Sequence, residues 1–295
     1  MRLLFLALSG VAGLPSAVAL EEPPTPSPSP TPIVGFIDSG MNRELPELKE
    51  HVESDPGFFA DQGSADVTDE RDHGTAVTER FVSQAKALGV SDFQIRMVKM
   101  ESSAFIVQAI DHLISQGATI INMSIDFFLL DSGEQARYQE ALRRKYNEVL
   151  FVVSAGSTRM NLFQHELHST QQSLNNVLVV GGTAELPQGH VISTGYGSVV
   201  DLYGALKPID GLSTTGERKR MRGVSFFLPD VTATALAISV KSGEKRPRKL
   251  ISKLSKCTTT IRTTGDPKKR ISLLGKPSDC ITKLFPPKPA PETPK

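Results

Sequence analysis

The sequence predicts an α/β protein with a doubly wound, mostly parallel sheet and helices on both faces. Short apolar segments rich in β-branched residues recur along the chain, as buried parallel strands do. Amphipathic segments with apolar residues three and four positions apart lie between them, which is typical of helices. Repeated alternation of strand and helix is the pattern of a parallel sheet that helices cover on both sides.

The first half of the chain contains three expected strands. Residues 33–37 are a short apolar run that ends at Asp38-Ser39-Gly40, and two further strands are expected at 93–99 and 118–123. Helices are expected over 77–88 and 106–114, because apolar residues there recur every three or four positions.

The second half continues the alternation. Residues 149–153 and 177–180 are wholly apolar, so they are expected to be strands buried on both faces. Helices are expected over 134–147, 229–240 and 247–257. On such sheets, functional residues tend to lie at the carboxyl ends of the strands. The residues that follow the strands are therefore the first candidates for a site.

The N-terminus has the pattern of an export signal. Arg2 precedes a short apolar region, and Ala17-Val18-Ala19 matches the small residues at which such signals are cleaved. A hydrophobic first strand is the alternative, but residues 20–32 alternate Pro with Ser and Thr, which disfavours both helix and sheet. We therefore expect a signal peptide at 1–19, a Pro-rich tether at 20–32, and export to the periplasm or the extracellular space.

The two cysteines, Cys257 and Cys280, are too few for a disulfide-dense scaffold or a four-cysteine zinc site. Export permits a disulfide between them, and a bridge that closes a loop of this length stabilises a fold by about 3 kcal/mol. Two free buried thiols are the alternative.

Charge is distributed unevenly along the chain. Residues 241–295 hold 15 Lys and Arg against 4 Asp and Glu, a net charge of +11, so residues 1–240 carry −10. We expect a domain over 33–260 and a basic extension over 261–295, which is either a solvated tail or a surface for an anionic partner.

The chain has no Trp to stack on bases, and nucleic acid is not the expected partner. No apolar stretch is judged to reach membrane-spanning length, so no transmembrane segment is expected after signal cleavage.

Three short motifs fall where a strand ends or a helix begins: Asp38-Ser39-Gly40, His73-Gly74-Thr75 and Gly223-Val224-Ser225. A serine hydroxyl becomes a good nucleophile when an imidazole takes its proton and a carboxylate holds that imidazole in the right tautomer. Asp38, His73 and Ser225 are candidates for such a triad. Singly, each has an ordinary alternative as a turn residue or a helix cap.

These motifs resemble those of the subtilisin-like serine peptidases, the subtilases. The resemblance covers about residues 33–260 and includes segments similar to the core strands of the family. It implies a subtilisin-like fold in which Ser225 is the nucleophile, His73 is the general base and then acid, and Asp38 is the orienting carboxylate. It also implies a polypeptide substrate, with a substrate-binding set made of Ser124, Ile125, Asp126, Ala155 and Gly156.

The chain departs from the family at the oxyanion loop. The family has Ala-Ala-Gly-Asn there, and this chain has Ser154-Ala155-Gly156-Ser157. The resemblance implies the Ser225 backbone N–H and Ser157 as oxyanion donors, but a hydroxyl reaches less far than an amide and can bond locally instead. In subtilisin, loss of the amide donor lowers turnover by about 10²–10³-fold. The chain is therefore expected to be a slow or an inactive enzyme.

The expected function is that of an exported serine endopeptidase. The alternative is a catalytically weak or inactive subtilase fold that binds peptides or partners. No cofactor or metal is expected: His165 and His168 lack an evident third ligand. For the acidic stretch 55–72, a solvated loop is preferred over a structural calcium site.

Overall fold

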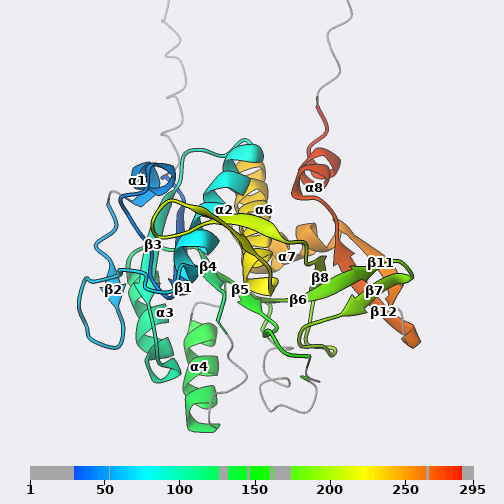
Figure 1. Cartoon of the computed structure of the whole chain (residues 1–295), viewed down its shortest axis with the longest axis horizontal. Coiled ribbons are helices and arrows are strands. Elements are labelled where there is room, and N and C mark those ends of the chain that lie inside the picture. Colours follow the sequence, from blue (N-terminus) through cyan, green and yellow to red (C-terminus); the bar gives the residue numbers. More distant parts are fainter. Residues whose placement is uncertain are drawn as a thin grey trace, which may run out of the picture. The chain divides into compact units, whose positions relative to one another are not determined.

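The computed structural model describes residues 30–52, 54–125, 132–144, 147–159, 162, 174–263 and 266–287. Met1–Pro30 and Thr31–Lys295 form separate units, and the helices and strands described below belong to the second (Figure 1). The predicted signal peptide, most of the predicted tether, Asp126, His165 and His168 lie outside the described residues.

A ten-stranded sheet runs through the second unit. Its parallel centre is made, in spatial order, of β3 (Gln94–Lys99), β1 (Ile33–Asp38), β4 (Ile120–Met123), β5 (Leu150–Ser154) and β6 (Val177–Leu186). The two-residue strand β2 (Phe58–Phe59) extends the sheet in parallel beyond β3. The mostly parallel α/β architecture predicted from the sequence is confirmed.

The other end of the sheet contains strands that the apolar pattern does not predict. β7 (Gly189–Ile192) pairs with β6 in antiparallel fashion, and β8 (Leu202–Ala205) pairs with β6 in parallel. β11 (Thr258–Thr263) pairs with β7 and with β12 (Asp266–Leu274), and β12 in turn pairs with β8. Because β7 and β8 both pair with β6, these five strands form a closed ring. β7 and β8 have four residues each, which gives local periodicity little to detect.

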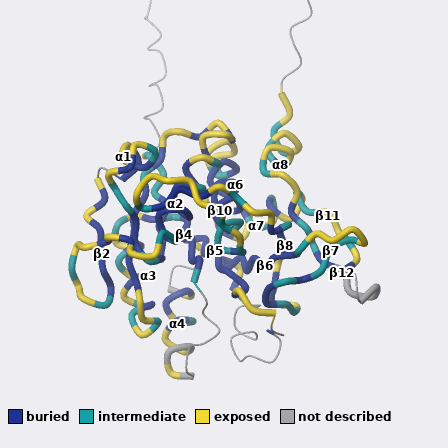
Figure 2. Tube along the Cα trace, in the orientation of Figure 1, coloured by how far each residue is buried: buried dark blue, intermediate teal, exposed yellow. Residues whose placement is uncertain are grey.

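Helices cover both faces of the sheet (Figure 1). One face carries α1 (Pro46–Val52), α2 (His73–Ala87), α6 (Leu228–Ser242) and α7 (Pro247–Ser255), and the other carries α3 (Ile106–Ser115) and α4 (Ser132–Arg144). Side chains alternate along β1, since Val34 and Phe36 join the first core and Ile37 joins the second. Figure 2 shows that the central strands and the middle of α6 are buried.

One described segment, Val224–Ser242, is long and apolar enough to cross a membrane, with a mean hydropathy of 1.3. The expectation that no stretch reaches that length is therefore wrong. In the structure, 67% of this segment is buried inside the protein, and α6 contacts α2, β4 and β5. Residues 228–238 of α6 are all buried, and this accounts for the apolar composition, because a helix at the centre of a core has no solvated face.

The basic segment is folded where the structure describes it. β11 and β12 form an antiparallel hairpin, α8 (Pro277–Leu284) follows, and a disulfide joins Cys257 to Cys280. Leu250 and Leu254 of α7 pack into the core, whereas most basic residues of α7 are exposed. The expected boundary at residue 260 falls inside β11. The described part of the extension is therefore continuous with the sheet.

Candidate active site

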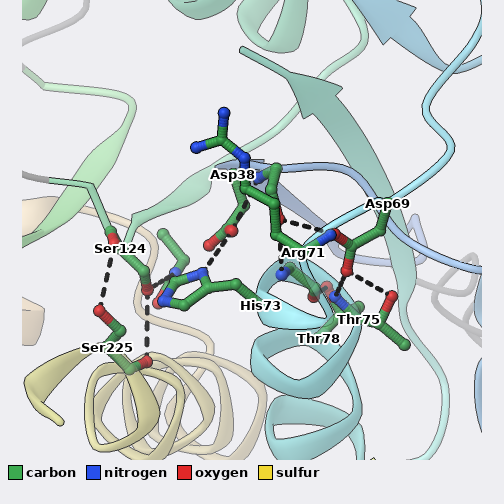
Figure 3. Close-up of polar contacts among 11 residues, drawn as sticks. Asp38, Asp69, Arg71, His73, Thr75, Thr78, Ser124 and Ser225 are labelled. Atoms are coloured by element: carbon green, nitrogen blue, oxygen red, sulfur yellow. Dashed lines mark hydrogen bonds and ion pairs between the residues drawn. The ribbon is translucent and has the colours of Figure 1, made fainter. Parts of the chain in front are cut away.

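Three elements place Asp38, His73 and Ser225 in one region (Figure 3). Asp38 is the last residue of β1, and His73 is the first residue of α2. Ser225 lies in η3 (Val224–Phe226), the short 3-10 helix that leads into α6. Because α2 and α6 pack against each other on the same face of the sheet, these distant positions in the sequence meet at the carboxyl ends of the strands.

The Asp38 carboxylate orients the His73 ring. His73 Nδ1–H donates to Asp38 Oδ1 over 2.6 Å, and the Ser39 backbone N–H donates to the same oxygen over 2.7 Å. The Asp38 side chain is only 1% exposed, and the His73 side chain is 31% exposed. A proton on Nδ1 leaves Nε2 as the basic atom of the ring. The arrangement therefore suits His73 to accept a proton at Nε2.

The surroundings of His73 adjust its basicity. Burial lowers the pKa of His73, but the charge of Asp38 and the hydrogen bond to it raise the pKa by more, and Asp69 adds to the increase. Arg71 opposes them weakly, and the net result is a pKa above the usual value of 6.5. The imidazolium form is thus stabilised in the folded protein, as a general base requires once it has taken a proton.

We expect the rate at which an active-site-directed fluorophosphonate modifies the protein to fall as the pH drops through the raised pKa of His73. A protonated imidazole cannot accept the Ser225 proton, so the midpoint should lie above 6.5. Initial labelling rates between about pH 5 and pH 9 measure it. Asp38→Asn removes the charge that raises the pKa of His73, so its midpoint should be lower. Equal midpoints in the two proteins would contradict the assignment of the midpoint to the titration of His73.

The start of α2 approaches the end of β1 closely at Gly74. A Cβ on Gly74 would lie 2.0 Å from the Gly40 carbonyl oxygen and 3.1 Å from Asp38 Oδ1. The Gly74 N–H also donates to Ser39 Oγ over 3.0 Å. The lack of a side chain at this position therefore allows His73 to reach Asp38.

A second carboxylate, Asp69, holds the same two segments (Figure 3). Its Oδ1 accepts a hydrogen bond from the Ser39 hydroxyl over 2.9 Å. Its Oδ2 accepts the backbone N–H of Thr75 over 2.9 Å and the Thr75 hydroxyl over 2.7 Å. Ser39 follows Asp38, and Thr75 lies two residues after His73, so Asp69 fixes the main chain beside both. The sequence reasoning missed Asp69, whose one signal was its place in the acidic stretch before His73.

Ser225 is anchored to the end of β4. Its hydroxyl donates to the Ser124 carbonyl oxygen over 3.2 Å, and the Ser124 hydroxyl donates to the Ser225 carbonyl oxygen over 3.4 Å. Within the described residues, Ser225 Oγ makes no hydrogen bond to His73, and the Phe226 ring centre lies 5.3 Å from that of the imidazole. Transfer of the Ser225 proton to Nε2 would therefore require the Ser225 side chain to turn away from Ser124.

An ion pair links the two helices that adjoin the site. Arg80 Nε and Nη2 donate to the two carboxylate oxygens of Asp230 over 2.7 and 2.8 Å. Burial raises the pKa of Asp230, although Arg80 opposes that increase. Because α2 begins at His73 and α6 follows Ser225, this bidentate pair fixes the separation of the two helices.

The loop 154–157, for which the resemblance implies the oxyanion site, follows β5. Met123 pairs with Val153, so this loop lies next to Ser124. Ser154 Oγ accepts the Gly156 N–H over 3.0 Å, and Gly156 has a φ of +83°, which glycine adopts without strain. Ala155 is buried and Ser157 is exposed.

On the substrate-binding strand implied by the resemblance, Ser124 is buried and Ile125 is half buried against the core that contains α3 and α4. Asp126 lies outside the described residues. The backbone N–H groups of Glu101 and Ser102, beyond the end of β3, both donate to Asp61 over 2.9 Å. These two backbone N–H groups are therefore already hydrogen-bonded within the protein.

No three His, Cys, Asp or Glu side chains gather into a metal site within the described residues. Several carboxylates of the acidic stretch 55–72 accept hydrogen bonds from the protein instead. Asp55 accepts the backbone N–H groups of Gly57 and Met97, each over 3.0 Å. These carboxylates hold the loop in place.

Comparisons with known proteins agree with this architecture. Residues 29–267 match the model of the subtilase family. Among solved structures, a cold-adapted subtilisin-like serine proteinase is 19% identical with a TM-score of 0.63, over 83% of this chain and 88% of that one. The nisin leader peptidase of Lactococcus lactis is 17% identical with a TM-score of 0.64, over 86% and 88%.

The A subunit of an AB5 toxin from E. coli is also 17% identical, with a TM-score of 0.68 over 86% of this chain and 92% of that one. Among curated protein sequences, none matches. At these identities the solved structures establish the fold. The family match extends over most of the sequence, and on that ground the chain belongs to the subtilase family.

Proposed function

We propose that the protein is a serine endopeptidase that cleaves peptide bonds through an acyl-enzyme. The observation that carries the proposal is the 2.6 Å hydrogen bond from His73 to the buried carboxylate of Asp38, in the region that also holds Ser225. Membership of the subtilase family supports it.

In the proposed reaction, Ser225 Oγ attacks the carbonyl carbon of a peptide bond while His73 Nε2 takes the hydroxyl proton. Asp38 stabilises the imidazolium that forms. The negative charge on the carbonyl oxygen is met by the Ser225 backbone N–H and, with a shorter reach, by the Ser157 hydroxyl. His73 then gives its proton to the leaving amine, and water, activated by the same ring, hydrolyses the acyl-enzyme.

The alternative function is peptide or partner binding on an inactive subtilase fold. It is favoured by the Ser225 hydroxyl, which bonds to Ser124 rather than to His73, and by Phe226, whose ring lies beside the imidazole. A binding protein needs neither a free Nε2 nor an oxyanion site.

Labelling of the purified folded protein with a fluorophosphonate separates these functions. The endopeptidase proposal expects one phosphonyl adduct per chain, which peptide mapping by mass spectrometry locates at Ser225. Heat-unfolded protein is the control for non-specific reaction. A folded protein that is labelled no more than the unfolded control supports the binding function.

We predict that Ser157→Asn raises kcat on a peptide substrate by about tenfold or more, because an amide extends further toward the developing oxyanion than a hydroxyl does. The interaction is made mainly in the transition state, so KM should change little. Steady-state kinetics at matched folded fraction, checked by circular dichroism, measure the effect. Ser157→Ala is the paired variant and should be no faster than wild type. An unchanged or lower kcat in Ser157→Asn would mean that Ser157 is already an adequate donor, that another group fills the oxyanion site, or that the loop does not lie where the resemblance places it.

We further propose that the protein is exported and cleaved after Ala19. The support is the Ala17-Val18-Ala19 pattern and the disulfide between Cys257 and Cys280, a bond that persists in oxidising compartments. N-terminal sequencing of the mature protein should begin at Leu20. Ala17→Arg disrupts the cleavage pattern and should leave a longer chain. A wild-type mature protein that begins at Met1 would rule out the cleavage.

A further inference from the structure

The residue before His73 has an unusual backbone conformation. Asp72 has a φ of 60° and a ψ of −1°, and it is the one non-glycine position with a positive φ in the described part of the chain. This left-handed conformation is unfavourable for a residue that carries a Cβ atom. The Asp72 side chain does not cap α2. Contacts elsewhere must therefore hold Asp72 in place.

Those contacts come from one hairpin, formed by β9 (Ile209–Leu212) and β10 (Arg218–Met221). Asp72 Oδ1 accepts the Thr214 backbone N–H over 2.8 Å and the Thr214 hydroxyl over 2.6 Å. Asp72 Oδ2 accepts a hydrogen bond from Lys219 Nζ over 2.6 Å. The bonds to Lys219 and Thr214 lower the pKa of Asp72 to about 2, so the carboxylate is ionised at neutral pH.

The same hairpin continues into the segment that carries Ser225. β10 ends at Met221, and η3 begins at Val224. Asp72 thus joins the chain that precedes His73 to the chain that precedes Ser225. The turn at Thr214 is also tied to the Asp38 side of the site, because its carbonyl oxygen accepts a bond from Asn42 Nδ2 over 2.7 Å.

The position of His73 depends on this arrangement. The first N–H groups of a helix have no partner within it, so its first residue takes its direction from the residue before it. Here the first helical hydrogen bond, from the Ala76 N–H to the Asp72 carbonyl oxygen, spans 3.3 Å. A change in the φ or ψ of Asp72 would swing the His73 side chain away from Asp38 and Ser225.

We propose that Asp72 is a positioning residue, which acts through His73 by binding Thr214 and Lys219 of the β9–β10 hairpin. It sets the direction of the His73 ring toward Asp38 and toward Ser225. The kinetic part of this inference rests on the proposed peptidase function. The effect on the His73 ring does not depend on that function, because the ring is held in the same way whether or not the site is catalytic.

Two variants test the inference. Asp72→Gly removes the carboxylate, and glycine adopts a positive φ without strain, so an effect of this variant cannot be due to backbone strain. Thr214→Val removes one hydrogen bond without changing any charge, so it separates geometry from electrostatics. Glu244→Gln is the matched control, because Glu244 forms a comparable ion pair with Arg246 over 2.7 Å beyond the end of α6, and its pKa is also lowered to about 2.

The first readout is the pKa of His73, followed by NMR titration of its ring protons in the full mature chain. We expect Asp72→Gly to lower that pKa by about 0.5 or more, as the hydrogen bond to Asp38 loosens. Thr214→Val should lower it by less, and Glu244→Gln should leave it unchanged. The second readout is kinetic: in Asp72→Gly, kcat should fall about tenfold while KM stays within about twofold.

The outcomes separate the two proposals. If Asp72→Gly and Thr214→Val both leave the titration of His73 unchanged, Asp72 does not position the ring. A loss confined to KM also overturns the inference. If Asp72→Gly does not fold, Thr214→Val decides by itself. If the wild-type protein shows no turnover but the two titrations shift, the peptidase proposal fails and the positioning role of Asp72 stands.

Discussion

Replacement of Ser225 by alanine is expected to lower kcat for peptide hydrolysis by about 10⁴–10⁶-fold, down to the background of the assay. The hydroxyl oxygen of Ser225 is the protein atom that bonds to the substrate carbon in the proposed reaction, and a methyl group cannot replace it. The Ser225 side chain is partly buried and, among the described residues, its hydroxyl hydrogen-bonds to Ser124 alone, so the fold should survive the change. Thermal unfolding by circular dichroism checks this point.

His73→Ala should cause a loss of similar size, and the double variant with Ser225→Ala should be no worse than either single variant. Residues that act as one unit give strongly non-additive effects, because removal of either partner disables both. Ser83→Ala is the control, since Ser83 is an exposed residue of α2 on the same helix as His73. Losses that add in the double variant would show that Ser225 and His73 act independently, which contradicts a triad.

Replacement of Gly74 by alanine is expected to destabilise the fold by about 1–3 kcal/mol and to remove most of the activity. A Cβ at this position would lie 2.0 Å from the Gly40 carbonyl oxygen. That atom belongs to the backbone and cannot rotate away, so the start of α2 must move. His73 moves with it, and its 2.6 Å hydrogen bond to Asp38 lengthens.

The two effects of Gly74→Ala have separate measurements. Urea unfolding gives the loss in the free energy of unfolding, and fluorophosphonate labelling of the folded fraction gives the loss at the site. Gly275→Ala is the matched control, because its Cβ would come no nearer than 3.9 Å to any neighbour, the Cys257 carbonyl oxygen. If Gly74→Ala has full stability and full labelling, the close approach at this position does not constrain the site.

The main features of the fold were predictable from local patterns. Residues 33–37 and 149–153 are short and wholly apolar, and this composition is typical of strands that are buried on both faces of a sheet. The structure places them in β1 and β5, at the centre of the sheet. The same reasoning missed β7 and β8, whose short segments have no marked periodicity, and it set a domain boundary inside β11.

By itself, the sequence determined the α/β class, the subtilase resemblance, and the positions of Asp38, His73 and Ser225 at the ends of strands and the starts of helices. It did so because strand and helix periods, and the residues that end them, are local properties of the chain. Only the tertiary structure decided what holds those three residues. Asp72 and Thr214 are 142 positions apart, and Arg80 and Asp230 are 150 apart. Such contacts depend on how helices and hairpins pack on the sheet, and no local period carries that information.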